Sequence, residues 1–379
     1  MKKKTSLLRN SAVQSLLASL LCIIIGVLIG YIVLLFINPE GAGEAITTIL
    51  KNFLTYPSAK AQSKYLGSTL VKTAPLLLCS LSILFAYKVG LFNIGAAGQY
   101  VAGAAVSIYA ALAWGMPWWV CLILAAAAGA LFGAISGLLK AKCNVNEVIS
   151  GIMLNWIGLY TANMLLSNVK ESASPYTFSI EGHASRALIP TLGLDKLFAN
   201  NKYVTLAIPL SVIMALIIWV VLDKTKFGYE LKATGMNKNA AKYSGMKEDR
   251  NIVLTLIIAG GLAGLAAATL FLTGYEQWMC TQSSVPSMGF NGIAAAFLGG
   301  LNPIGAIFSS FFIQHITSGG AYVNKTLYCS QISDLISSII IYLCGFVLFF
   351  KYFLNNALDR KEAKRAEKAA NSNDEGGKD

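Results

Sequence analysis

Residues Asp223–Arg250 read DKTKFGYELKATGMNKNAAKYSGMKEDR, a long polar and basic stretch with extended apolar runs on both sides. Inside this stretch Asn237 is placed as an N-cap, and Lys238–Ser244 supply about two turns of helix. Gly245 follows at the position where a residue with left-handed backbone commonly ends a helix. The stretch therefore predicts a short, capped helix inside a polar loop.

The predicted short helix has one face of small side chains. Ala240, Ala241 and Ser244 share that face, which would fit closely into a groove on a partner. Tyr243 and Met246 are placed to add anchoring contacts. A second short turn precedes the helix and contains Gly228, Glu230, Ala233 and Gly235. The alternative is a solvated basic loop with no partner.

The composition places the chain in a lipid bilayer. Of its 379 residues 55% are hydrophobic and 13% are charged, against about 25% charged in soluble proteins. The mean hydropathy is +0.60. A net charge of +12 would suggest nucleic acid as a partner of a soluble protein. Here membrane topology explains the charge better, so no nucleic-acid partner is expected.

Apolar runs of roughly 20 residues are needed to cross a bilayer, and they predict an all-α, polytopic membrane protein with ten spans. The predicted spans are Ser15–Ile37, Ser68–Tyr87, Gly98–Trp114, Trp118–Leu139, Val148–Leu166, Tyr203–Leu222, Ile252–Leu272, Gly289–Gly300, Pro303–Ser318 and Leu335–Phe353. The eighth and ninth are short, which favours broken or re-entrant helices. The first is too long for a signal-peptide core, so we expect it to be retained.

Lys and Arg residues fix the predicted orientation. With the N-terminus inside, 21 of them fall on the cytoplasmic side and eight in the outer loops, as the positive-inside rule requires. Both termini are therefore expected in the cytoplasm. Residues 1–353 form the predicted membrane domain, with 223–250 as a cytoplasmic loop. Residues 354–379 form a charged cytoplasmic tail, predicted to be largely disordered.

Cofactor and metal motifs are not found in the sequence. The seven cysteines form no CxxC pair and read as small hydrophobes, although a bridge between Cys280 and Cys329 is left open. The two histidines are far apart, and no GxxxxGK[ST] loop occurs. No cofactor is expected in this chain, so any ATP must be bound by another chain.

Polar side chains inside predicted spans mark a candidate solute path, because they are costly in lipid. The candidates are Asn93, Gln99, Asn155, Trp156 and Asn291. Asn93 and Asn291 lie in two similar glycine-rich stretches, an internal echo typical of repeats with broken helices. We expect both to line the path. For Gln99 and Asn155 an interhelical hydrogen bond is an equal alternative, and Trp156 with Tyr160 forms an aromatic stripe for packing or stacking.

Four stretches resemble the permeases of the branched-chain amino acid, ribose and nucleoside superfamily of ABC importers, and within it the purine-nucleoside (guanosine-type) branch. They are GLFNIGAAGQ (90–99), NEVISGIMLNWI (146–157), GYELKATGMNKNAAKYSGM (228–246) and GFNGIAAAFLGGLNPIG (289–305). The family motif FNIGxEGQ carries an acidic residue where this chain has Ala97, which puts an ionic role there in doubt.

The resemblance implies a type II-like ABC importer permease that works by alternating access in a bacterial cell membrane. It implies ATPase subunits, a second homologous permease in a heterodimer, and an extracytoplasmic solute-binding lipoprotein as partners. The loop then docks on the ATPase through Gly228, Glu230, Gly235, Asn237, Ala240, Ala241, Tyr243 and Gly245. A nucleoside is the expected solute. Ribose-type sugars, branched-chain amino acids and riboflavin are the alternatives. Rivals from other classes are an ion-coupled secondary transporter, disfavoured because the spans are poor in acids, and a scaffold without transport.

Overall fold

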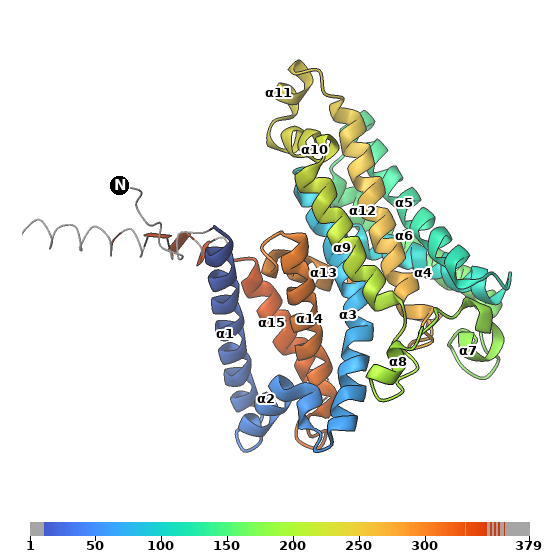
Figure 1. Ribbon diagram of the computed structural model, residues 1–379, viewed down its shortest axis with the longest axis vertical. Coiled ribbons are helices and arrows are strands. Elements are labelled where there is room, and N and C mark those ends of the chain that lie inside the picture. The colour runs from blue at the N-terminus through green and yellow to red at the C-terminus, as the bar shows by residue number, and fades with distance from the viewer. Residues whose placement is uncertain are drawn as a thin grey trace, which may run out of the picture.

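The computed structural model describes residues 11–329, 331–346, 349–350, 352–353, 355–356 and 360. Within these residues the fold is all-helical, with fifteen α-helices and no strand (Figure 1). Two isolated bridges, Lys170 with Thr177 and Tyr176 with Met279, hold the long loop after the fifth predicted span. The predicted tail 354–379 lies almost entirely outside the described residues.

The helices are, in chain order, α1 (Ser11–Ile37), α2 (Ala42–Lys51), α3 (Ala59–Tyr87), α4 (Ala96–Leu112), α5 (Trp118–Cys143), α6 (Glu147–Leu166), α7 (Ile180–His183), α8 (Leu194–Leu197), α9 (Ala207–Lys224), α10 (Lys226–Met236), α11 (Lys238–Tyr243), α12 (Glu248–Phe271), α13 (Met288–Leu298), α14 (Pro303–Gly319) and α15 (Ile332–Cys344). Four short 3-10 turns accompany them, at Asn52–Thr55, Ser167–Val169, Ser185–Ala187 and Gly320–Tyr322.

Six of these helices are long and apolar enough to cross a membrane, namely α1, α3, α5, α6, α9 and α12. Helices α4 and α13 are apolar but shorter. The 11 residues of α13 span about 16 Å at 1.5 Å each, roughly half of a 30 Å hydrocarbon core. The eighth and ninth predicted spans correspond to two separate helices, α13 and α14, and their being broken or re-entrant stays a prediction. The tenth predicted span begins in α15 and runs partly outside the described residues, and the count of ten stays a prediction.

Helix α3 lies in the middle of the molecule, between α13 and α14 on one side and α9 and α12 on the other (Figure 1). Every residue from Thr73 to Ala86 is buried. The same stretch is apolar on nearly all faces, which is the pattern of a helix surrounded by others. Pro75 lies inside it. Helix α3 is therefore the core around which the bundle is assembled.

Helices α5 and α12 pack with their backbones in contact. A Cβ added at Gly133 would lie 2.0 Å from the Leu256 carbonyl oxygen, and one at Gly129 would lie 2.2 Å from that of Gly260. Gly264 approaches the Ala125 carbonyl oxygen equally closely. The glycines recur every four residues, the small-xxx-small spacing that lets membrane helices approach. We call this contact the glycine seam.

The two ends of the bundle carry different elements. Helices α10 and α11 protrude at one end, and α2 and α8 lie at the other (Figure 1). This separation agrees with the predicted cytoplasmic and outer loops. The Lys72 ammonium on α3 pairs at 3.0 Å with the carboxylate of Glu276, in the loop that follows α12. Cys280 and Cys329 are both free thiols, so the bridge left open by the sequence is not formed.

Candidate functional site

Asn93 and Gln99 form a closed pair of amides just before and inside the first turn of α4. The Asn93 Nδ2 donates to Gln99 Oε1 at 2.8 Å, and Gln99 Nε2 donates back to Asn93 Oδ1 at 3.1 Å. Asn93 Nδ2 also donates to the Ser82 hydroxyl on α3 at 3.0 Å. Both amides are buried. The pair fixes the interrupted segment 90–95 to α3 and satisfies its own polar groups.

Asn155 ties helix α6 to the same segment. Its Oδ1 accepts from the Gly98 amide at 2.7 Å, and its Nδ2 donates to the Ile94 carbonyl at 3.1 Å. A Cβ at Gly98 would lie 2.7 Å from the Asn155 Cα, so only glycine permits this approach. Asn155 therefore fills an interhelical bonding role at the start of α4, one of the two alternatives weighed from the sequence.

The two glycine-rich stretches that echo each other in the sequence meet in the fold. A Cβ at Gly289 would lie 2.5 Å from the Cα of Ala97. Ala97 is fully buried, so no space exists there for the acidic side chain of the related motif. Asn291, two residues after Gly289 in α13, is half-buried. Four neutral amides therefore lie at or contact the starts of α4 and α13, namely Asn93, Gln99, Asn155 and Asn291. Side chains of this kind favour hydrogen bonding over ionic chemistry.

Trp156 lies on a different surface from its neighbour Asn155. It stacks on Tyr160 with ring centroids 6.1 Å apart and an angle of 25° between the planes. Both rings are exposed, together with Met153 and Ile157 on the same helix. The predicted aromatic stripe is thus present on an outward face of α6, and the structure does not bring it to the Asn93–Gln99 pair.

The polar stretch after α9 folds into two short helices instead of one helix and a turn. Thr225 caps the first, α10, because its Oγ1 accepts from the Gly228 amide at 3.1 Å. Thr225 is an N-cap that the sequence pattern offers but that we did not predict, since threonine is among the preferred N-cap residues. A Cβ at Gly228 would lie 2.1 Å from the Val221 carbonyl oxygen, so this glycine lets α10 fold tightly back on α9.

The predicted caps of the second helix, α11, are confirmed. The Asn237 Oδ1 accepts from the Ala240 amide at 3.0 Å, and Gly245 has a φ of +80°. The amides of Gly245 and Met246 donate to the Lys242 and Ala241 carbonyls, both at 3.0 Å, which is the Schellman pattern. The helix ends at Tyr243, one residue before the predicted end.

The predicted small face of α11 is wrong in one respect. Ala241 is only 3% exposed and points into this chain, whereas Ala240 and Ser244 are exposed. The reason is tertiary packing, since α11 lies against α10 and α12 and must turn one side toward them. The free surface is larger and more apolar than expected, because Met236 is 90% exposed and Tyr243 is 93% exposed.

Helix α10 touches the loop that leads to Asn93. A Cβ at Gly235 would lie 2.5 Å from the Val89 carbonyl carbon, and one at Gly90 would lie 3.0 Å from the Gly235 oxygen. Burial at this contact lowers the pKa of the Lys88 ammonium, against the opposing effect of the Asp223 carboxylate. Helix α10 and the buried amide pair are therefore joined by backbone contacts through residues 88–93.

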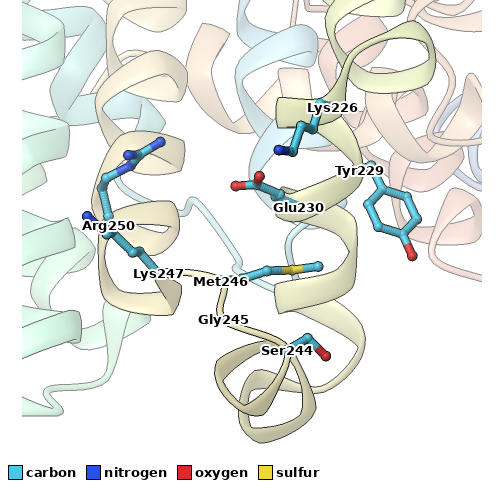
Figure 2. Close-up of a pocket in the computed structure, with 8 residues that line it drawn as sticks. All are labelled: Lys226, Tyr229, Glu230, Ser244, Gly245, Met246, Lys247 and Arg250. Atoms are coloured by element: carbon cyan, nitrogen blue, oxygen red, sulfur yellow. The ribbon is translucent and has the colours of Figure 1, made fainter.

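A pocket of about 390 Å³ opens beside α10, lined by Lys226, Tyr229, Glu230, Ser244, Gly245, Met246, Lys247 and Arg250. Figure 2 shows Lys226 and Glu230 on α10 and Lys247 and Arg250 across from them. In the part of the chain that the structure describes, no three His, Cys, Asp or Glu side chains are grouped so as to hold a metal ion.

The fold and these sites define a multi-pass membrane protein with a structured polar loop between two of its long helices. Residues 65–345 match the family described as branched-chain amino acid transport system / permease component. This chain belongs to that family, as a transport subunit of an ABC transporter and not an enzyme.

Three relatives illustrate the similarity. The guanosine ABC transporter permease protein NupP of Bacillus subtilis is 33% identical over 73% of this chain and 80% of its own length. The nucleoside ABC transporter permease protein NupB of Lactococcus lactis is 30% identical over 95% of this chain and 98% of its own. The glucose ABC transporter permease protein TsgB13 of Haloferax volcanii is 26% identical over 78% and 80%. No solved structure matches the chain.

Proposed function

We propose that the chain is the membrane-spanning subunit of an importer for nucleosides in a bacterial cell membrane. One observation carries this proposal, namely that the similarity to the nucleoside permease extends over nearly the full length of both chains. Asn291, a neutral amide near the start of α13 that keeps exposed surface, suits a neutral solute rich in hydrogen-bonding groups.

The assembly that we propose contains two permeases, ATPase subunits that bind ATP and magnesium, and an outer solute-binding lipoprotein. The guanosine relatives NupP and NupQ occur together in Bacillus subtilis, which supports a heterodimer. The outward aromatic face around Trp156 supports a second helical surface against α6, because such a face is unpartnered within the described chain. Both termini are proposed to lie in the cytoplasm, with residues 1–353 as the permease domain and 354–379 as its tail.

In the proposed path the five polar and aromatic residues have different roles. Asn93, Gln99 and Asn155 position the interrupted segment before α4, since their amides are occupied by one another and by backbone. These three side chains can be buried at membrane depth because their hydrogen bonds are made within the chain. Asn291 faces the solute, since it keeps exposed surface, and Trp156 lies on the outward face of α6 that contacts the second permease.

The proposed docking surface for the ATPase is formed by the exposed side of α10 and α11. Tyr243, Ala240 and the pocket-lining Glu230 contact the partner in this proposal. The remaining predicted residues Gly228, Gly235, Asn237, Ala241 and Gly245 shape the helices that present this surface. Movement of the ATPase pair would then reach segment 90–95 through the contact of Gly235 with Val89.

An uptake experiment tests the solute. The complex is purified from its native membrane and reconstituted in vesicles with its lipoprotein, and uptake of labelled guanosine, glucose, valine and riboflavin is compared. We expect ATP-dependent uptake of guanosine with little of the others. Guanosine uptake that depends on an ion gradient and not on ATP would contradict the proposal.

A simple sugar is the second candidate, because the similarity also extends to a glucose permease. In the same experiment this candidate predicts ATP-dependent glucose uptake that excess guanosine does not reduce.

A further inference from the structure

The basic side chains of the cytoplasmic stretch divide into paired and unpaired groups. Three lysines are paired with carboxylates, as Lys232 with Asp223 at 3.1 Å, Lys238 with Asp249 at 3.2 Å and Lys242 with Glu248 at 3.5 Å. Lys226, Lys247 and Arg250 make no ion pair with any residue in the described ranges. All three unpaired cations line the 390 Å³ pocket.

The pocket has the composition of a site for an anionic side chain. Its lining holds three cations against one carboxylate, that of Glu230. Figure 2 shows these groups on two sides of the opening, with Met246 between them. A guanidinium binds a carboxylate with two parallel hydrogen bonds, while Met246 and Tyr229 offer apolar surface to an aliphatic stem.

We propose that this pocket receives an acidic side chain of the ATPase subunit. The inference rests on the proposed docking of that subunit. It identifies the acidic group that sets the position of the ATPase on α10 and α11. Ser244 lines the pocket and directly follows Tyr243, so the pocket is continuous with the most exposed apolar side chain of the loop. Complementary charge at such a site sets orientation and association rate, and apolar anchors such as Tyr243 and Met236 supply affinity.

The ATPase is favoured over an anionic lipid headgroup as the source of the negative charge. The pocket is lined by residues of α10, of the turn between α11 and α12 and of the first turn of α12, and Figure 1 shows α10 and α11 protruding from the end of the bundle. Headgroups contact the juxtamembrane level, whereas a protein partner meets the protruding tip.

Carbodiimide cross-linking of the native complex tests the proposal, since this reagent joins an amine to a carboxylate in direct contact. We expect mass spectrometry to find Lys247 or Lys226 joined to one glutamate or aspartate of the co-purifying ATPase. Arg250→Gln should weaken ATPase binding on the order of 30-fold or more in detergent, as for truncation of a buried charge pair. The matched control Lys232→Gln removes a charge that is paired within the chain, and it should bind as the unaltered protein does. Lys247→Glu should weaken ATPase binding, and a lysine in place of the cross-linked acid of the ATPase should restore binding to the Lys247→Glu variant.

Three results would overturn the inference. If p-benzoylphenylalanine in place of Tyr243 cross-links to the ATPase but Lys226 and Lys247 do not, docking stands and the pocket has another role. If neither position cross-links, the proposed docking fails as well. If Arg250→Gln changes binding only in vesicles of phosphatidylglycerol and not in detergent, the pocket is a headgroup site.

Discussion

Replacing Gly235 by alanine should separate ATP hydrolysis from solute movement. Gly235 lies in α10, where alanine normally stabilises a helix by about 1 kcal/mol relative to glycine. Here the added Cβ would lie 2.5 Å, 2.7 Å and 2.8 Å from three backbone atoms of Val89. Since ordinary contact begins near 3.4 Å, α10 and the loop must separate by roughly 0.9 Å. Overpacking of this kind costs about 1–3 kcal/mol, which outweighs the gain in helix propensity.

The expected result follows from where that separation occurs. A bias of about 1–3 kcal/mol changes an equilibrium between conformations roughly 5- to 150-fold, so nucleoside uptake should fall by a factor in that range. The docking side of α10 is unaltered, so the complex should still elute with its ATPase and hydrolyse ATP. Gly182→Ala is the matched control, because nothing lies within 4 Å of its added Cβ. Unaltered uptake and solute-stimulated hydrolysis in Gly235→Ala would refute the idea that this contact transmits motion.

Three further predictions concern topology, the buried amides and the ion pair of Lys72 with Glu276. Reporter fusions after Leu222 should read cytoplasmic and fusions at Pro190 external, and the reverse readings would contradict the proposed orientation. Asn155→Leu leaves the partners of a buried amide unpaired, so it should lower the free energy of unfolding by about 1–3 kcal/mol. Thermal melting of this variant, compared with that of Asn155→Gln, measures the loss. Glu276→Gln should lower it by no more than about 1 kcal/mol, because the Lys72 and Glu276 side chains are 31% and 39% exposed, and a larger loss would show a buried network.

The parts of the fold predicted from sequence are those determined by neighbouring residues. Asn237 and Gly245 identify the ends of α11 because capping depends on a side chain and a backbone angle within three or four residues. The long apolar helices were identified for the same reason, as were the separate short helices before and after residue 300. In each case the physical cause lies inside the segment.

The parts not predicted depend on contacts between distant segments. Ala241 was expected to face water, but α11 lies against α10 and α12 and buries it. The approach of Gly235 to Val89 joins residues that no periodicity relates. Asn93 and Gln99 were recognised as polar groups at membrane depth, yet their mutual pairing emerges only when the chain closes the turn between them.

The glycine seam should make α5 and α12 move together. Because their backbones are in direct contact there, no flexible side chains separate the two helices, and we expect the pair to tilt as one rigid body. Helix α12 is 24 residues long, about 36 Å at 1.5 Å per residue. Its first turn carries Arg250, and its last turn leads to the loop that contains Glu276. We therefore expect a tilt imposed on the end of α12 beside the pocket to reach its other end, about 36 Å away, without loss between the two helices.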